Sequence, residues 1–551
     1  MSGVRQSAPA LPPQPGGPAR TAPAEAAGSA GGFLARAAFL TALLTAAGSV
    51  LGLVRDQTIA HLYGAGPGTD AFLVAWTIPE VSATLLIEDA MALILVPAFS
   101  LALARRADPQ PPAGPDPVLH LVRTTLPRLF LALGACSALL IATAPWVVAL
   151  LAPGLDEPGL AVDCTRLTAT CAFTYGLAGY CSAALRAHGS FVAPAAIYIA
   201  SNVGIITTML AVRGSGARDD GVRTAAAGVV IGGVLMVLIQ LPELWRKLRK
   251  RQFAAPVSRK ALAAGSSVAL GLIAPVIVFA AGRQSQVLIE RFLAAPLPAG
   301  AISHLNYAQK VAQIPMTLSL MLCTVTFPVV ARAMAAGETD RARRRVERDL
   351  ALAAMMVLTG AALVISCAPQ FIAVLFQRGE FTAADTAATA DVMRVYALGL
   401  LGHTLVGALV RCYFSAARPL WFPALAMAAG LLLTAGAGLL LVQVWGVLGI
   451  AAANALGITL TAVLLLRGLG RHSVPVDIRA VTRGLLKLAA AAAAATGSGW
   501  LCGTLVPVPA LGVTAACLVV PAVFLLLAHV LRAPETDTLL RPVSRKPAHA
   551  R

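Results

Sequence analysis

The chain has 551 residues, of which 58% are hydrophobic and 12% charged, and its mean hydropathy is +0.78. These values exclude an ordinary soluble domain and indicate an integral membrane protein. The net charge of +18 does not indicate nucleic acid, because aromatic residues make up only 5% and the basic residues lie in short gaps between apolar runs. Membrane lipids, and not nucleic acid, are therefore the expected neighbours.

Residues 1–32 are rich in Pro, Ala and Gly and predict a disordered cytoplasmic tail, because they cannot bury a core. Beyond this tail, apolar runs long enough to cross about 30 Å of hydrocarbon predict an all-α integral membrane fold of about fourteen transmembrane helices. The first seven predicted spans are 33–54, 69–103, 121–151, 159–186, 190–213, 222–244 and 261–292. The second seven are 300–333, 347–376, 385–415, 419–442, 445–467, 481–504 and 509–532.

The loops predict the orientation, since Lys and Arg beside short loops are retained in the cytoplasm. The strongly basic loops, including 245–260, follow even-numbered spans, whereas the gaps after spans eleven and thirteen carry no charge. Both termini, including the basic tail 533–551, are therefore predicted to be cytoplasmic in a multi-pass membrane protein. The basic runs need no specific partner, because topology and attraction to anionic lipid explain them.

Three landmarks at helix ends recur at a nearly constant offset of about 230 residues, which predicts an internal repeat. The pairs are Pro97 with Pro328, Gly154 with Gly379, and Pro194 with Pro423. An offset of six spans preserves orientation, so we expect two six-helix lobes, 33–244 and 261–467, related in parallel by an axis along the membrane normal. The two helices of 481–532 lie outside the repeat.

Ionisable residues within apolar segments are candidate functional residues, because a charge facing hydrocarbon is costly unless it has a partner or faces a cavity. They cluster in the first two spans of each lobe, and they include Glu290 and also Glu80, to which no role is assigned. The candidate substrate-binding residues are Arg55, Asp70, Glu88, Asp89, Arg291 and Lys310. The alternative for Arg55 with Asp56, and for Glu290 with Arg291, is pairing at helix ends in the headgroup region.

The sequence contains no phosphate-binding glycine loop with its lysine and no histidine pair at helical spacing with a glutamate. The longest gap between spans is roughly twenty residues, too short for a soluble catalytic domain. We therefore expect a transporter with no cofactor and no metal site, and not an enzyme.

Seven short segments form a set that occurs in one known family: VLGLVRD at 50–56, GAGPGTDAF at 64–72, ERFL at 290–293, LNYA at 305–308, FP at 327–328, LFQRGEFT at 375–382 and YFS at 413–415. Together they resemble the MviN/MurJ family, the lipid II flippases of bacterial cell-wall synthesis. The resemblance implies a two-lobed exporter that works by alternating access, as a multi-pass protein of the bacterial cytoplasmic (inner) membrane. It also implies a cationic central cavity for the diphosphate and sugar headgroup of a polyprenyl-linked glycan, and contact with the cell-wall synthesis machinery. A diphosphate in such a cavity needs cations, and the arginine fork suits its oxygens.

At the family's polar positions, Arg55, Asp70 and Glu88 match. The resemblance implies that Arg55 and Lys310 contact the diphosphate, while Asp70 and Glu88 orient them or carry protons. Ser49, Ala83 and Thr84 stand where the family has arginines, and Lys310 stands where it has another.

The favoured function is transfer of lipid II from the cytoplasmic to the periplasmic leaflet. The alternatives are a flippase for another polyprenyl-linked surface polysaccharide, a small-molecule exporter of the same superfamily, a membrane glycosyltransferase or ligase, and a non-transporting scaffold.

Overall fold

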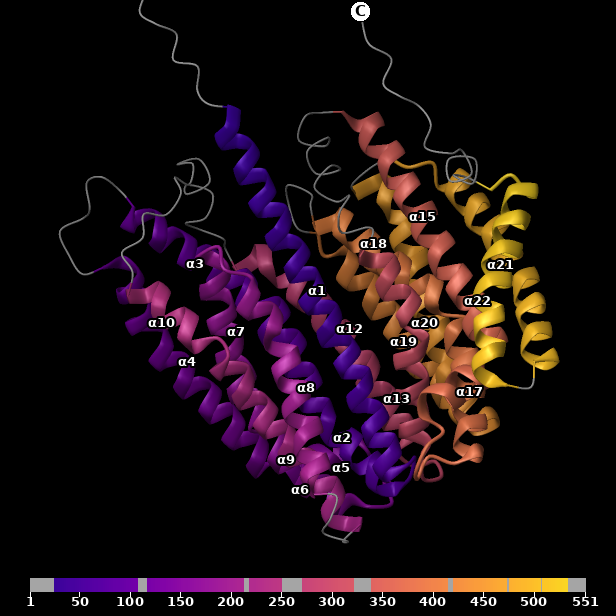
Figure 1. Cartoon of the computed structure of the whole chain (residues 1–551), viewed down its shortest axis with the longest axis horizontal. Coiled ribbons are helices and arrows are strands. Elements are labelled where there is room, and N and C mark those ends of the chain that lie inside the picture. Colours follow the sequence, from indigo (N-terminus) through magenta and orange to yellow (C-terminus); the bar gives the residue numbers. More distant parts are fainter. Residues whose placement is uncertain are drawn as a thin grey trace, which may run out of the picture.

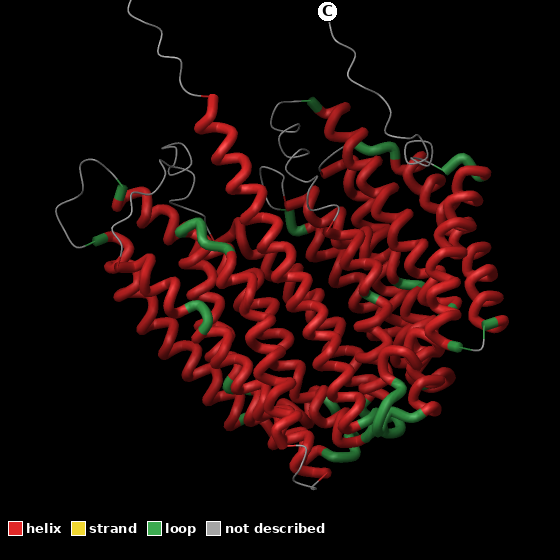
Figure 2. The backbone as a smooth tube through the Cα atoms, in the orientation of Figure 1, coloured by secondary structure: helices red, strands yellow, loops and turns green. Residues whose placement is uncertain are grey.

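The computed structural model describes residues 24–107, 116–212, 218–249, 270–321, 338–414, 420–472, 475–506 and 508–533. Most of the predicted basic loop 245–260, nearly all of the tail 533–551 and the end of the predicted eighth span lie outside these residues. Within the described residues every regular element is a helix (Figure 2), so the predicted all-α class is confirmed.

The described residues of the amino-terminal half form eleven helical segments in chain order. They are α1 (Ala24–Tyr63), α2 (Pro67–Ser82), η1 (Ala83–Ala90), α3 (Met91–Arg106), α4 (Pro117–Ala142), α5 (Ala144–Leu151), α6 (Pro158–Thr168), α7 (Cys171–Ala187), α8 (Val192–Val212), α9 (Arg218–Leu238) and α10 (Leu241–Arg249). Helix α1 begins at Ala24 and not near residue 33, so it extends into the segment predicted to be a tail. The predicted tail is therefore helical in its last part.

The carboxy-terminal half contains ten described helices. They are α12 (Leu270–Ala294), α13 (Ala301–Ala312), α15 (Thr339–Ser366), α16 (Ala368–Phe376), α17 (Ala383–Ala397), α18 (Leu400–Phe414), α19 (Phe422–Trp445), α20 (Val447–His472), α21 (Ile478–Leu505) and α22 (Pro509–Val530). The first of them, α12, corresponds to the predicted seventh span, and the others follow the predicted second set in order.

Ten helices of the described residues are long and apolar enough to cross a membrane, or eleven if the bent pair α17 and α18 forms one span. Several predicted spans are divided between helices: 121–151 into α4 and α5, 159–186 into α6 and α7, and 347–376 into α15 and α16. The span 385–415 divides into α17 and α18, which meet at 47°. The predicted count of fourteen is not reached by this criterion and stays a prediction.

The helices form two groups that lie side by side (Figure 1). Helices α1 to α10 make one group and α13 to α22 the other, with α12 at the boundary, and α1 begins at the same end of the bundle as α15. We call these groups the N-lobe and the C-lobe, counting α12 with the C-lobe because it packs chiefly against α19. Their boundaries and their parallel relation stay predictions.

The lobes are joined mainly towards one end. There α13 contacts α2, α12 contacts α2, η1 and α5, and α1 contacts α16. The largest hydrophobic cluster includes residues of both lobes, for example Phe72 of α2 and Tyr307 of α13. Two smaller clusters each belong to a single lobe: Phe99 and Tyr180 lie in one, Phe279 and Tyr413 in the other. The packing therefore ties the lobes together through elements near one end of the bundle.

Candidate functional site

A cluster of three charged side chains connects the lobes. Glu80 of α2 accepts hydrogen bonds from Arg291 Nη2 of α12 and from Lys310 Nζ of α13, each at 3.1 Å. The Arg291 side chain is 5% exposed, whereas that of Lys310 is 31% exposed. One carboxylate of the N-lobe is thus held by two cations of the C-lobe, and we call these three residues the ion cluster.

Local sequence explains the position of both cations. Arg291 lies in the last turn of α12 and Lys310 in the last turn of α13, where a positive charge also interacts favourably with the helix dipole. The two helices follow one another among the described elements, and one cation from each contacts the Glu80 carboxylate. Glu80 follows Pro79, which lies inside α2, and precedes the π-helical segment η1. Such π-helical turns occur often at functional sites.

The ion cluster has unused hydrogen-bonding capacity. Arg291 Nη1 is buried and has no hydrogen-bond partner among the described residues. An arginine presents five N–H donors in a planar fork, and Glu80 occupies only part of it. Because a buried donor without a partner is unfavourable, this guanidinium is suited to bind a further anionic oxygen.

Glu290 and Arg291 are neighbours in sequence but have different partners. Glu290 accepts a hydrogen bond from the Asn454 amide within the C-lobe, and Asn454 also contacts His403 Nε2 at 3.1 Å. Arg291 extends to Glu80 of the N-lobe. Both side chains are buried and their hydrogen bonds go to different residues, Asn454 and Glu80, so the described contacts contain no hydrogen bond between Glu290 and Arg291.

Arg55 is held within the N-lobe. It forms an ion pair with Asp56 at 2.7 Å, its Nη1 lies 3.3 Å from Asn202 Oδ1, and its guanidinium lies 4.3 Å from the centre of the Trp76 ring. The predicted pairing with Asp56 is present, but both side chains are buried among helices. Arg55 and Lys310 therefore belong to different polar groups in this conformation.

Asp70 joins the lobes in a different way. Its carboxylate accepts hydrogen bonds from the backbone N–H of Gly300 at 2.7 Å, from the backbone N–H of Ser303 at 2.8 Å and from the Ser303 hydroxyl. These groups form the amino-terminal end of α13, where unpaired N–H groups and the helix dipole attract a negative charge. Asp70 of the N-lobe thus caps a helix of the C-lobe.

Backbone contacts lie beside this cap. The Glu380 N–H donates to the His61 carbonyl across the lobes at 3.1 Å. Gly300 has a φ of +91°, and a Cβ at this position would lie 2.8 Å from the Ala65 carbonyl oxygen. Glycine is therefore required there by both the backbone angle and the close approach of the other lobe. We call the Asp70 cap and the His61–Glu380 contact the latch.

The last two candidates lie in η1. Glu88 is exposed and accepts a hydrogen bond from the Tyr198 hydroxyl of α8 at 2.9 Å. The side chain of Asp89 lies outside the described part of the chain. Neither residue joins the ion cluster or the latch in the contacts that are described.

Sequence reasoning assigned no role to Glu80, the centre of the ion cluster. The available signal was a single carboxylate in an apolar run directly after a proline, within a predicted span. Its partners are 211 and 230 residues away, which no local pattern reveals.

Comparison with known proteins agrees with this architecture. Residues 59–519 match the model of the family described as lipid II flippase MurJ. The lipid II flippase MurJ of Burkholderia cenocepacia is 29% identical over 388 residues, covering 68% of this chain and 73% of that protein. The probable lipid II flippase MurJ of Rhizobium meliloti is 25% identical over 396 residues, covering 70% and 71% respectively.

Two solved structures share the fold. A lipid II flippase MurJ in an inward closed conformation superposes with a TM-score of 0.70 at 17% identity, covering 91% of this chain and all of that one. An inward-facing multidrug resistance transporter of the MATE family has a TM-score of 0.61 at 16% identity, covering 79% and 96%. Since the family model covers most of the chain, this chain belongs to the lipid II flippase MurJ family.

Proposed function

We propose that this protein is a flippase that moves a polyprenyl-diphosphate-linked cell-wall precursor, with lipid II the favoured substrate, from the cytoplasmic to the periplasmic leaflet. The observation that carries the proposal is the ion cluster, in which two cations of the C-lobe hold one carboxylate of the N-lobe. Membership of the flippase family supports the same substrate class. Transport, and not catalysis, is the proposed activity.

The substrate diphosphate is proposed to replace Glu80 on Arg291 and Lys310. A diphosphate offers more anionic oxygens than one carboxylate, and Arg291 has a buried donor that Glu80 leaves unused. Binding would then remove the charged contact between α2 and the ends of α12 and α13. In this way the free energy of headgroup binding weakens one connection between the lobes, as a ligand-driven shift between two conformations requires.

The latch is proposed to close the periplasmic end of the path. The loop containing Gly379 is predicted to be periplasmic, and the latch joins this loop to the end of α1 through Glu380 and His61. An opening towards the periplasm would have to break the Asp70 cap of α13. The enzymes that supply the substrate would be those of cell-wall synthesis on the cytoplasmic side of the membrane.

The orientation can be tested by reporter fusions at the predicted loops. Fusions after Arg345 should report a cytoplasmic position and fusions at Gly379 a periplasmic one, because the first turns of α15 are strongly basic. The opposite result at both sites would reverse the proposed direction of transport.

The function can be tested with the purified protein in liposomes that contain fluorescent lipid II. Transfer between leaflets is measured by the fraction of fluorophore that a membrane-impermeant quencher reaches. We expect transfer by the wild-type protein and its loss in the double variant Arg291→Ala, Lys310→Ala. The matched control is Arg341→Ala. It removes an exposed arginine of α15 whose ion-pair partner, Glu338, is the N-cap residue of the same helix.

A different polyprenyl-diphosphate glycan is the second candidate, because the N-lobe side of the site is less cationic than the family pattern. Ala83 and Thr84 are uncharged, and the Thr84 hydroxyl bonds to the Glu80 carbonyl within its own helix. Depletion of the protein in cells, followed by identification of the lipid-linked intermediate that accumulates, separates the two candidates. No transfer of lipid II by the wild-type protein, with accumulation of another lipid-linked glycan, would favour the second.

A further inference from the structure

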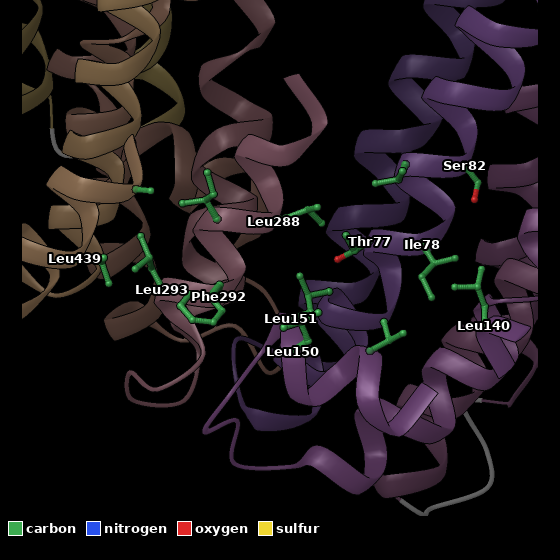
Figure 3. Close-up of a pocket in the computed structure, with 14 residues that line it drawn as sticks. Thr77, Ile78, Ser82, Leu140, Leu150, Leu151, Leu288, Phe292, Leu293 and Leu439 are labelled. Atoms are coloured by element: carbon green, nitrogen blue, oxygen red, sulfur yellow. The ribbon is translucent and has the colours of Figure 1, made fainter. Parts of the chain in front are cut away.

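A large apolar cavity lies between the lobes, beside the ion cluster. Its volume is about 570 Å³, and it is lined by α2, α4 and α5 of the N-lobe and by α12 and α19 of the C-lobe (Figure 3). Leu140, Leu150 and Leu151 face Leu288, Phe292 and Leu439 across it.

The lining of this cavity excludes a polar ligand. Only Thr77 and Ser82, of the 14 lining residues, carry hydroxyl groups, and no lining residue is charged. The Thr77 hydroxyl is directed to the Leu73 carbonyl of its own helix at 3.5 Å. A cavity with such a lining does not hold ordered water, because water needs several polar partners.

The rim of the cavity opens to the surroundings of the helix bundle. Leu150, Leu439 and Phe292 are 77%, 52% and 42% exposed although they line the cavity. In a protein that spans a membrane, the surroundings of such residues are hydrocarbon chains. A lipid chain can therefore enter the cavity from the side without crossing a polar surface.

The cavity and the ion cluster are parts of the same helix segments. Ile78 and Val81 line the cavity within one turn of Glu80, and so do Ile289 and Phe292 within one turn of Arg291, while helix pitch puts both charged residues on another face of these helices. A lipid whose diphosphate binds Arg291 and Lys310 would have the start of its chain at the same level of α2 and α12 as the cavity. A bulk phospholipid carries one phosphate and gains less from these two cations.

We propose that this cavity binds the isoprenoid chain of the transported lipid, close to its diphosphate. The proposal rests on the proposed function, since it uses the same headgroup site. Both lobes line the cavity, so a rearrangement of the lobes changes its shape while the chain is bound. Because the chain binds between the lobes, its position depends on how the two lobes are arranged.

The test is photo-crosslinking of the full-length protein in phosphatidylglycerol vesicles. The first probe is lipid II with a diazirine on an isoprene unit next to the diphosphate, the second is lipid II with the diazirine in its peptide, and the third is phosphatidylglycerol with a diazirine in its acyl chain. Labelled residues are identified by mass spectrometry. The first probe should label α5, α12 and α19 at the cavity, and excess unlabelled lipid II should suppress this labelling.

Ala435→Trp is the diagnostic variant, because Ala435 lines the cavity on α19. It should lower labelling of the cavity by the first probe roughly tenfold, since the indole excludes the isoprene units whose burial holds the chain. The matched control is Ala428→Trp, the same substitution at an exposed position of α19, two turns away and outside the lining. It should leave labelling unchanged.

The outcomes separate this inference from the proposed function. Labelling by the peptide probe that excess lipid II suppresses, with no labelling of the cavity by the isoprene probe, would overturn the inference and leave the function in place. Cavity labelling by phosphatidylglycerol that excess lipid II does not displace would also overturn it. Absence of displaceable labelling by both lipid II probes would contradict the proposed function itself, and the inference with it.

Discussion

The ion cluster and the latch both connect the N-lobe to the C-lobe, but through different chemical groups. In the ion cluster, Glu80 contacts side-chain cations, Arg291 and Lys310. In the latch, Asp70 contacts backbone N–H groups at the start of α13, and a carbonyl meets an N–H between His61 and Glu380. Helix α13 takes part in both, with Lys310 at its end and Gly300 at its cap.

This difference indicates which connection a ligand can control. A phosphate oxygen can take the place of the Glu80 carboxylate, because the cations remain paired when it does. The N–H groups that Asp70 caps are enclosed between the lobes, and Asp70 is 4% exposed. The ion cluster is therefore suited to sense the substrate, whereas the latch is suited to hold one conformation until α13 moves.

The largest expected effect follows from loss of Arg291. Arg291→Ala should reduce transfer of lipid II at least about 100-fold, because it removes the buried guanidinium proposed to bind the diphosphate. The liposome assay measures this loss. Removal of one partner of a buried ion pair also destabilises a protein by about 3 kcal/mol or more, so membrane abundance must be measured as well.

A double variant separates stability from substrate binding. Glu80→Gln, Arg291→Ala removes both charges of one pair and should recover abundance without recovering transfer. Recovery of transfer in this variant would mean that Arg291 serves only to neutralise Glu80.

The second effect concerns the latch. Asp70→Ala should weaken the contact between the lobes by about 1–2 kcal/mol, the usual contribution of a helix amino-terminal cap. This corresponds to a shift of roughly tenfold in the equilibrium between conformations. Hydrogen exchange by mass spectrometry should show faster exchange of the Gly300 and Ser303 amides and also of the Glu380 amide, because both parts of the latch open together.

Asp477→Ala is the matched control for the latch. Asp477 caps α21 by accepting from the backbone N–H groups of Arg479 and Ala480, all within the C-lobe. Its loss should raise exchange at the start of α21 alone. Faster exchange at Glu380 in this control would mean that the effect of Asp70→Ala is general destabilisation.

The smallest expected effect is that of Lys310→Arg. Both residues are cations, so the contact with Glu80 should persist, and the guanidinium fork adds donors for phosphate oxygens. Transfer of lipid II should stay within about threefold of the wild-type rate or rise, whereas Lys310→Ala should lower it about tenfold. A strong loss in Lys310→Arg would indicate that Lys310 acts through its size and flexibility and not through charge.

Composition and the length of apolar runs were sufficient to predict the all-α class and the order of the long helices, because about twenty apolar residues have one stable arrangement in a bilayer. The break between α17 and α18 was not predicted, since neither helix contains a proline near it. It lies at Gly399, where a Cβ would be 2.9 Å from the Ala455 Cα of α20. The break therefore lies where the chain packs closely against α20, and local sequence does not encode this contact.

The candidate site was predictable in its residue types but not in its partners. Arg291, Lys310 and Asp70 were identified because charges are costly in apolar segments. The sequence did not reveal that Asp70 caps α13, because donor and acceptor are 230 residues apart. Nor did it separate Arg55 from Lys310, because the contacts of Arg55 with Asn202 and Trp76 depend on the packing of α1, α2 and α8.

The substrate diphosphate and Glu80 are proposed to compete for Arg291 and Lys310. This competition is tested by measuring how tightly purified Glu80→Gln protein binds lipid II, and how tightly it binds the same lipid with a monophosphate in place of the diphosphate. Gln keeps the size of the side chain and removes the competing charge, so we expect lipid II to bind about tenfold more tightly than to the wild-type protein, and the monophosphate lipid to gain less affinity. Unchanged or weaker binding of lipid II to Glu80→Gln would rule out this competition.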